Sequence, residues 1–275
     1  MPPKSKLGLI AGRGELPQLV LDAARAEGRP VFVLALEGQT APELVAGAEN
    51  AWIPMGSVGR GIDILKAAGV VDVVFAGGVR RPSLLKLGLD GRAARLMAKL
   101  GKAALGDDKL LSVLIKELED EGLHVVGADD LLSGLLAGEG VMGRCRPDEV
   151  ALADIDRGAE IARRLGALDV GQGVVVQQGI VLGVEAIEGT DALIARSAAV
   201  SREGPGGVLV KVKKPGQERR ADLPTIGIAT VRAAAAAGLR GIAVEAGNTL
   251  LLGRDAAIEA ADAAGIFLVG IKVPE

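Results

Sequence analysis

Reactive side chains are scarce in this chain. It has one histidine, one cysteine and no tyrosine, and aromatic residues make up 1% of its 275 residues. A single cysteine excludes an internal disulfide framework. The shortage of aromatic rings removes the platforms on which nucleic-acid bases stack, and a net charge of -3 gives no basic surface for a phosphate backbone. The sequence therefore argues against nucleic-acid binding and leaves carboxylates, lysines, backbone amides and a bound metal as carriers of chemistry.

The chain also lacks a long apolar segment near its start. The first apolar run extends only from Leu7 to Ala11. A membrane span needs about 20 apolar residues, and the apolar core of a signal peptide is also longer than this run. We therefore expect a soluble, cytoplasmic protein. The composition is compatible with peripheral contact with a membrane surface and with a homodimer.

The chain is rich in aliphatic residues and glycine: 49% of its residues are hydrophobic and 40 are glycines. In the first half, short apolar runs alternate with helical stretches, which predicts a doubly wound, Rossmann-like parallel sheet in an α/β domain. Strands are expected at Leu7–Ala11, Val31–Leu36, Val73–Ala76 and His124–Gly127, and helices at Leu16–Glu27, Gly61–Ala68, Arg92–Leu105 and Lys109–Glu121.

A glycine-rich segment, Gly138–Pro147, predicts the boundary between two domains. We expect a nucleotide-binding domain at 1–140 and a second α/β domain at 141–275 that carries the catalytic carboxylates. In the second domain, helices are expected at Asp148–Leu165, from Thr190, at Ile226–Gly238 and at Ala256–Ala264. Strands are expected at Gly173–Gln178, Ile180–Ala186, Val208–Val212, Gly241–Glu245 and Ile266–Ile271, the first two as a hairpin.

Two glycine turns follow predicted strands of the first half. Gly12 and Gly14 come after the first strand, and Gly77 and Gly78 come after the third. Gly12 and Gly14 can take positive φ and let backbone N–H groups approach an anion at the N-terminus of the next helix. Ligands of open α/β sheets bind beyond the carboxyl ends of the strands. The turns therefore predict a nucleotide-phosphate site, with plain strand-to-helix turns as the alternative.

Carboxylates and lysines gather in the second half. Glu185 lies near the end of an apolar strand, and Glu188 follows it in a turn that opens a helix. Thr190 or Asp191 can cap that helix, but a cap does not explain Glu185. A buried carboxylate needs a partner, so we expect a lysine, an arginine or a metal beside it. Lys211 alternates with valines in a later strand, where it either neutralises phosphate or faces solvent.

Asp222 is the third carboxylate of interest. It directly precedes a predicted helix whose first turn would hold Pro224 and Thr225. That position places Asp222 at the mouth of a helix N-terminus, which suits a metal-bound phosphate. Glu245 ends a later strand before another glycine turn. The convergence of these residues on strand ends predicts a site for a hard cation and a phosphate.

Six motifs, in this order, extend across nearly the whole chain: LGLIAGRGELP (7–17), GGVRRP (77–82), GDDKLL (106–111), GVEAIEGTD (183–191), VKVKKPGQERRADLPTIG (210–227) and VEAGNTLLL (244–252). With them the chain resembles the UDP-2,3-diacylglucosamine pyrophosphatases of the I type. The resemblance implies a Rossmann-like N-terminal domain and a family-specific C-terminal domain with an essential aspartate, matched here by Asp222.

The resemblance also implies a reaction. The substrate would be hydrolysed to UMP and 2,3-diacylglucosamine 1-phosphate (lipid X) in the lipid A biosynthesis of Gram-negative bacteria, next to the inner membrane. The reaction would depend on Mg²⁺, with water attacking one of the two phosphorus atoms; we favour the one nearer the sugar. The single histidine, His124, excludes the histidine-rich binuclear metallophosphoesterase solution to this step. We expect the acyl chains to lie between the two halves of the chain.

Together, the residues and the resemblance predict a set of site residues. The predicted catalytic residues are Asp222, Glu188 and Lys214, and the predicted ligands of Mg²⁺ are Asp222, Glu185 and Glu188. The predicted substrate-binding residues are Gly12, Gly14, Gly77, Gly78, Gln178, Thr190, Lys211, Gln217, Thr225 and Glu245.

Two other functions remain open from the sequence. A nicotinamide-dependent oxidoreductase would use Gly12, Gly14 and Glu37, although the absence of tyrosine removes the Tyr-Lys pair of short-chain dehydrogenases. A non-catalytic sensor of nucleotide sugars would keep the glycine turns but has no use for Asp222 and Glu188. A co-purified cofactor would identify the first, and failure to release UMP would identify the second.

Overall fold

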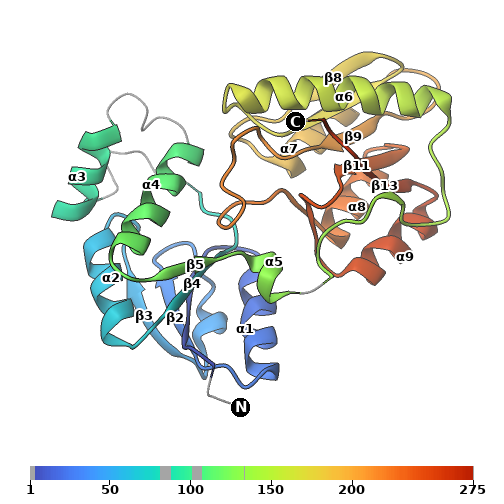
Figure 1. The fold of residues 1–275 in the computed structure, drawn as a ribbon. Helices are drawn as coiled ribbons and strands as arrows, with labels where there is room; N and C mark the ends of the chain where they lie inside the picture. Colours follow the sequence, from blue (N-terminus) through green and yellow to red (C-terminus); the bar gives the residue numbers. More distant parts are fainter. Residues whose placement is uncertain (1–3, 81–87, 101–106, 133, 275) are drawn as a thin grey trace. The chain divides into compact units, whose positions relative to one another are not determined.

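The computed structural model describes residues 4–80, 88–100, 107–132 and 134–274 (Figure 1). The contacts within the chain divide it into two compact units. The first unit contains residues 1–133 and the short segment Glu218–Asp222, and the second contains residues 134–217 and 223–275. The chain therefore passes between the units at 133/134, 217/218 and 222/223, whereas the sequence predicts one division at 140/141.

The first unit is built on a parallel sheet. Its strands are β1 (Leu7–Ala11), β2 (Val31–Leu36), β3 (Glu49–Ile53), β4 (Asp72–Ala76) and β5 (His124–Val126). They lie in the order β3-β2-β1-β4-β5, and every neighbouring pair is parallel. This is the doubly wound arrangement that the strand and helix alternation predicts, so the α/β class is confirmed.

Helices cover both faces of this sheet. They are α1 (Leu16–Ala26), α2 (Val58–Ala67), α3 (Gly91–Leu100), α4 (Asp107–Asp120) and α5 (Ala128–Leu131), with a 3-10 turn η1 (Pro42–Val45). On one face, Phe32 and Leu34 of β2 cluster with Leu65 of α2 and Leu118 of α4. Figure 1 shows α1 and α5 on the opposite face. The predicted helix Arg92–Leu105 extends beyond α3 into residues outside the described part of the chain.

The edge strand β3 was not predicted from the sequence. It begins with the exposed residues Glu49 and Asn50, and it pairs only with β2 on one side. Of its five residues only Ile53 is buried. An edge strand with a polar start does not form the continuous apolar run by which the buried strands are found.

The second unit holds a mixed sheet. Its strands are β6 (Gly140–Val141), β7 (Gly173–Gln177), β8 (Ile180–Val184), β9 (Val208–Lys211), β11 (Gly241–Glu245) and β13 (Phe267–Ile271), in the order β6-β13-β11-β9-β7-β8. β9, β11 and β13 are parallel, and β7 and β8 form the predicted hairpin. Two short strands, β10 (Thr225–Ile226) and β12 (Leu250–Leu251), pair with each other in parallel.

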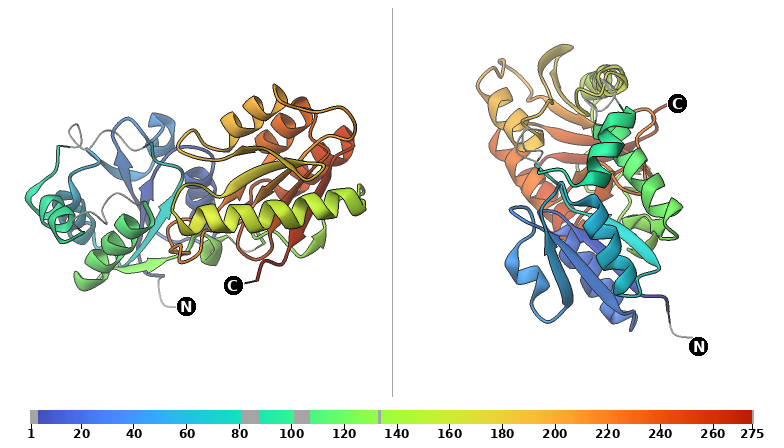
Figure 2. Two further views of the ribbon diagram at one scale, coloured as in Figure 1. Left: turned by 90° about the horizontal axis from the view of Figure 1, so that it is seen from above. Right: turned by 90° about the vertical axis from the view of Figure 1, so that its left-hand side faces the viewer.

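Helices also cover both faces of this second sheet. They are α6 (Glu149–Ala167), α7 (Thr190–Ala198), α8 (Ile228–Ala236) and α9 (Arg254–Ala264). α6 packs on one face and the other three pack on the opposite face (Figures 1 and 2). A Cβ atom on Gly158 of α6 would lie 2.6 Å from Cγ2 of Val210, so glycine allows this close approach of helix to sheet. No helix in the described parts of the chain is long and apolar enough to cross a lipid bilayer.

Helix α7 has a different N-cap residue from the one that the sequence predicts, and helix α8 begins later than predicted. The N-cap residue of α7 is Gly189, which has no side chain to cap the helix. α8 starts at Ile228, because Thr225 belongs to β10 and the carbonyl of Pro224 accepts a hydrogen bond from Leu250. The predictions that Thr190 or Asp191 caps α7 and that Pro224 and Thr225 form the first turn of α8 are therefore wrong.

Candidate functional site

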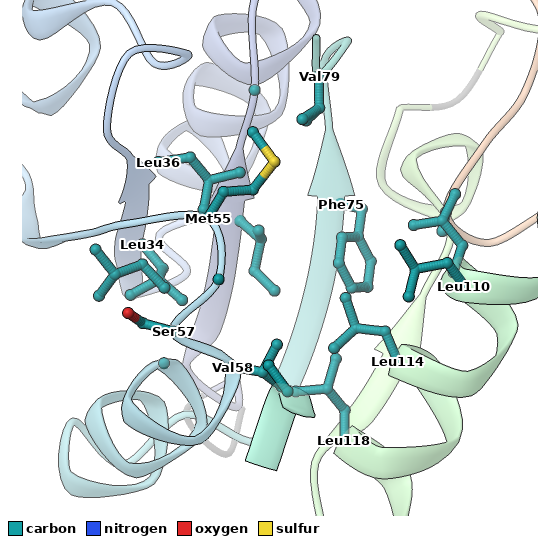
Figure 3. Close-up of a pocket in the computed structure, with 18 of the residues that line it drawn as sticks. Leu34, Leu36, Met55, Ser57, Val58, Phe75, Val79, Leu110, Leu114 and Leu118 are labelled. Carbon is teal, nitrogen blue, oxygen red and sulfur yellow. The ribbon is translucent and has the colours of Figure 1, made fainter. Parts of the chain in front are cut away.

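An apolar pocket lies within the first unit. Its volume is about 340 Å³, and residues of α2, α3 and α4 line it together with the sheet. Phe75 of β4 lies beside Leu114 and Leu118 of α4 in this pocket, and Val58 belongs to the α2 side (Figure 3). Most of the lining is aliphatic, and Asp222 is its single ionisable residue in the part of the chain that the structure describes.

The two predicted glycine turns meet at this pocket. The N–H of Gly12 donates to the carbonyl of Ala76 at 2.8 Å, and the N–H of Arg13 donates to the carbonyl of Gly78 at 2.8 Å. The N–H of Gly78 in turn donates a hydrogen bond to the carbonyl of Arg13 at 3.1 Å. The loops that follow β1 and β4 are thus joined to each other at the carboxyl ends of neighbouring strands, where open α/β sheets bind ligands.

Gly12 is needed for a reason that the sequence did not indicate. A Cβ atom at Gly12 would lie 2.6 Å from the carbonyl oxygens of both Gly77 and Gly78, closer than atoms can approach. Gly12 does not have a positive φ, whereas Gly14 does, at 89°. The N–H of Gly12 donates to the carbonyl of Ala76, the last residue of β4, rather than being directed at an anion.

A glutamine that the sequence analysis did not single out joins the same loops. Oε1 of Gln39 accepts hydrogen bonds from Nε of Arg13 at 2.9 Å and from the backbone N–H of Arg80 at 3.0 Å. Nε2 of Gln39 donates to the carbonyl of Arg80 at 3.2 Å. Gln39 follows β2, so one side chain connects the loops after β1, β2 and β4. No motif marks such a residue, because its role depends on the strand order.

Asp222 belongs to a short turn of the first unit. The N–H groups of Ala221 and Asp222 donate to the carbonyl of Glu218 at 3.1 and 3.0 Å, which closes one helical turn. The expected position of Asp222 at the N-terminus of the following helix is wrong, because β10 separates it from α8. Four predicted site residues instead line the apolar pocket of the first unit: Gly12, Gly77, Gly78 and Asp222.

In the second unit, a second group of predicted residues gathers around a buried ion pair. Oε1 of Glu185 accepts a hydrogen bond from the hydroxyl of Thr190 at 2.6 Å, and Nζ of Lys211 lies 4.0 Å from the same oxygen. Lys211 donates to the hydroxyl of Thr190 at 2.6 Å and to the carbonyl of Thr225 at 3.4 Å. The expectation that Glu185 has a charged partner is confirmed, and Lys211 is buried rather than solvent-facing.

Glu245 lies at the same edge of the second sheet, because Val244 of β11 is opposite Lys211 of β9. Its Oε2 accepts the backbone N–H of Lys213 at 2.8 Å, and its Oε1 accepts Nδ2 of Asn248 at 2.5 Å. Both carboxylate oxygens of Glu245 therefore help to hold the loops after β9 and β11.

Comparison with known proteins identifies the family. The model of the LpxI N-terminal domain matches residues 6–135, and that of the LpxI C-terminal domain matches residues 138–269. A protein of Caulobacter vibrioides named UDP-2,3-diacylglucosamine pyrophosphatase LpxI is 42% identical over 279 residues, covering 98% of this chain and 99% of that protein. The chain belongs to the LpxI family. The resemblance inferred from the six motifs is confirmed.

The solved structures that resemble this LpxI-family chain have low sequence identity to it and low TM-scores. The NADPH complex of leucoanthocyanidin reductase from Vitis vinifera is 17% identical, with a TM-score of 0.28, over 54% of this chain and 41% of that one. A Rhizobium etli pyruvate carboxylase is 14% identical, with a TM-score of 0.30, over 63% of this chain and 15% of that one. Neither likeness supports an inference about function.

The three predicted catalytic residues of this LpxI-family chain have different surroundings. Oε1 of Glu188 pairs with Nη2 of Arg196 at 2.8 Å. A backbone N–H of its own turn and this guanidinium lower the pKa of Glu188. Nζ of Lys214 pairs with Oδ1 of Asp169 at 2.7 Å, while Asp222 lies in the turn assigned to the first unit. Their catalytic roles stay predictions.

Three predicted substrate-binding residues have local structural roles. Gln178, with φ of 50°, forms the turn of the β7–β8 hairpin, and its side chain donates to the carbonyl of Glu203 at 3.2 Å. That turn lies at the end of β7 remote from the end that pairs with Lys211. Oε1 of Gln217 accepts the N–H of Lys214 at 3.1 Å. Gly14 is exposed beside the first turn of α1.

The carboxylates offer limited means to hold a metal. Within the described ranges, no three side chains of the His, Cys, Asp and Glu types gather closely enough to hold an ion. Glu185 and Glu188 have Thr190 and Arg196 as partners. Mg²⁺, however, commonly uses one or two carboxylates and takes its other ligands from substrate phosphates and water. Asp222, which lines the same pocket as Gly12, Gly77 and Gly78, is a single carboxylate of that kind.

Proposed function

We propose that this protein hydrolyses the pyrophosphate bond of UDP-2,3-diacylglucosamine, giving UMP and 2,3-diacylglucosamine 1-phosphate. The observation that carries this proposal is the 42% identity, over nearly the full length of both chains, to a relative named for this activity. The first unit adds a chemical argument. A substrate with acyl tails and a pyrophosphate needs an apolar cavity beside groups that handle phosphate, and Asp222 and the glycine loops border such a cavity.

The apolar pocket supports the binding of an acyl chain. Leucine, isoleucine and valine side chains dominate its lining, and each methylene group moved into it from water contributes about 0.8 kcal/mol. Several methylene groups therefore supply much of the binding free energy of a lipid. This proposal gives an acyl chain a place inside the first unit and replaces the expectation of a groove between the halves.

The glycine loops support the binding of the pyrophosphate. They lie at the carboxyl ends of β1 and β4. Apart from its chain neighbours, no described residue would have an atom within 4 Å of a Cβ atom placed at Gly78, so a ligand has room beside it. The N-terminus of α1 follows the first loop, and the positive end of a helix dipole favours an anion.

Asp222 would carry the central chemical role, either by holding Mg²⁺ or by orienting the attacking water. Bound Mg²⁺ would neutralise charge on the pyrophosphate oxygens. The pocket that Asp222 lines is mostly apolar, so a phosphate held there would be poorly shielded by water and its charge interactions would be strengthened. Among the residues that the structure describes, Asp222 supplies the single carboxylate of that lining, which fits the one or two carboxylates that Mg²⁺ commonly uses.

The atoms that move can be followed with an isotope. We propose that water attacks the phosphorus nearer the sugar, so that a new P–O bond forms there and UMP leaves with the bridging oxygen. Reaction in H₂¹⁸O with Mg²⁺ should place the label in 2,3-diacylglucosamine 1-phosphate, as read by mass spectrometry. Label in UMP would indicate attack on the other phosphorus. Absence of UMP would refute hydrolysis, and a chelator should stop the reaction until Mg²⁺ is restored.

We also propose that the protein acts in the cytoplasm at the surface of the inner membrane, because a substrate with two acyl chains partitions into the bilayer. Co-sedimentation with vesicles that contain the substrate would support this location. Recovery of all protein in the supernatant would contradict it. A homodimer stays a prediction that sedimentation velocity can test.

A further inference from the structure

Two arginines beside Asp222 bind helices of the first unit. Nη2 of Arg219 lies 2.8 Å from Oδ2 of Asp129 in α5, and Nη1 of Arg220 lies 2.5 Å from Oε1 of Glu119 in α4. Both arginines belong to the turn Glu218–Asp222, and both acidic partners belong to the same unit as that turn. The turn is therefore fastened on two helices by charge pairs.

An ion pair inside the turn also stabilises it. Nε and Nη2 of Arg220 each lie 3.0 Å from one carboxylate oxygen of Glu218, a bidentate pair. This guanidinium lowers the pKa of Glu218, so that the carboxylate stays ionised. Arg220 thus connects the first residue of the turn to α4 through a single planar group.

A turn of five residues does not hold its own shape. One helical turn fixes several backbone dihedrals for one or two hydrogen bonds, so it is unstable without contacts to the rest of the protein. The turn Glu218–Asp222 has two such backbone bonds, both to the carbonyl of Glu218. Contacts with the first unit therefore help to fix its position, namely the packing of Ala221 against the core and the ion pairs of the two arginines.

We propose that Arg219 and Arg220 are positioning residues that dock this turn on α4 and α5 and thereby set the place of the Asp222 carboxylate in the pocket lining. The inference rests on the proposed role of Asp222 in hydrolysis. Neither arginine lines the pocket. They act on the reaction through Asp222, which follows Arg220 by two residues and lines the pocket with Gly12 and Gly78.

The two pairs differ in their shielding. In the first pair the side chain of Asp129 is 8% exposed and that of Arg219 is 42% exposed, whereas in the second pair Arg220 and Glu119 are 37% and 38% exposed. Exposed ion pairs contribute little, because water and salt screen them. A pair with one buried member is screened less, and removing its partner leaves a buried charge. Arg219 should therefore be the stronger anchor of the turn.

The experiment compares kcat and KM of Arg219→Ala, Arg219→Lys and wild type in UMP release. Displacement of a catalytic group by about 1 Å costs on the order of 10²-fold in rate, so we expect a loss of that order in kcat for Arg219→Ala, with KM little changed. Arg219→Lys should recover part of the rate, because it keeps the charge. Arg25→Ala removes an exposed arginine of α1 that bonds only to the carbonyl of Gly47 among the described contacts, and it should retain wild-type kcat.

A double-mutant cycle tests whether the pair itself is responsible. If Asp129 acts through Arg219, the variant Arg219→Ala/Asp129→Ala should be no slower than Arg219→Ala alone. A folded Arg219→Ala protein with wild-type kcat overturns the inference, as does an equal loss in Arg25→Ala. If Arg219→Ala does not fold, as judged by thermal unfolding, Asp129→Asn takes its place with the same criteria. Wild type that releases no UMP would instead refute the proposed function.

Discussion

At the scale of single residues, the glycines around the pocket have different structural roles. Gly12 and Gly77 allow two loops to touch: a Cβ at Gly77 would lie 2.4 Å from the carbonyl oxygen of Arg13. A substitution such as Gly12→Val would disrupt this contact and says little about a ligand. Gly78 faces open space and lines the pocket. It is therefore the glycine whose substitution reports on substrate.

We expect Gly78→Ala to raise KM for the substrate and to leave folding intact, since the added methyl group occupies space that a bound phosphate or ribose needs. Gly91→Ala is the matched control. Gly91 also faces open space, but it lies at the start of α3 and outside the pocket lining, so the change should leave KM unchanged. Steady-state kinetics of UMP release measures both. Equal KM in Gly78→Ala and wild type would remove this loop from the substrate site.

The surroundings of Glu185 show which features of the site could be predicted from single residues. That Glu185 needs a partner follows from its place at the end of an apolar strand, and Lys211 is that partner. That Thr190 would join the pair could not be predicted, because its hydroxyl is equally suited to cap a helix. Burial decides between these roles, and burial depends on the assembled sheet.

At the scale of elements, buried strands were predicted with nearly their observed bounds because their apolar runs are continuous: β1 and β2 match residue for residue. β3 and β10 were missed. β3 is an edge strand with a polar start, and β10 is two residues long and exists because it pairs with β12, far along the chain. Pairing over long sequence distances leaves no local pattern.

One aspartate joins two helices that line the pocket. Oδ2 of Asp90 accepts the backbone N–H groups of Gly59 and Arg60 in α2, at 2.7 and 3.3 Å. Its Oδ1 accepts those of Arg92 and Ala93 in α3, at 3.1 and 2.8 Å. Asp90 thus caps α3 and satisfies N-terminal donors of α2 at once.

We expect the stabilisation by Asp90 to depend on pH. Burial alone would raise the pKa of Asp90, but hydrogen bonds from Ala93, Arg60, Gly59 and Arg92 outweigh it and lower the pKa overall. A carboxyl with a lowered folded pKa stabilises the protein above its unfolded pKa of about 3.9 and loses this contribution as the pH falls through the folded pKa.

Asp90→Asn should therefore lower the free energy of unfolding by about 1 kcal/mol at neutral pH, because the amide removes the charge and keeps only one acceptor oxygen for the donors of two helices. The difference in free energy between the variant and wild type should shrink as the pH falls below the unfolded pKa of about 4, and it should be lost below the lowered folded pKa, where the wild-type carboxyl is also neutral. Urea unfolding of both proteins over a series of pH values measures this. A difference that stays constant down to the lowest pH would contradict the assignment.

At the scale of the whole molecule, the sequence predicts two α/β domains but not how the chain is shared between them. The turn Glu218–Asp222 lies deep in the second half of the sequence, yet its contacts are with the first unit. Composition and hydrophobic periodicity indicate a domain boundary only where the sequence contains a recognisable linker. The five residues Glu218–Asp222 are not flanked by recognisable linkers and are too few to show a periodic pattern. Their assignment to the first unit is therefore visible only in the contacts of the folded chain.

This sharing of the chain brings the proposed chemistry together in one unit. The glycine loops come from β1 and β4, the apolar lining from the helices and sheet of the first unit, and Asp222 from the late segment. Of the predicted catalytic residues, Asp222 is the one that lines this pocket. The account therefore depends on Asp222 more than on any other side chain.

The most direct test compares purified wild type with Asp222→Ala and Asp222→Asn for UMP release from UDP-2,3-diacylglucosamine in the presence of Mg²⁺, with substrate binding followed by calorimetry. We predict equimolar UMP and lipid product from wild type. Both variants should bind substrate but release almost no UMP, because a group that acts on the reacting atoms affects kcat far more than ground-state affinity. Turnover by either variant at a near wild-type rate would contradict the central claim.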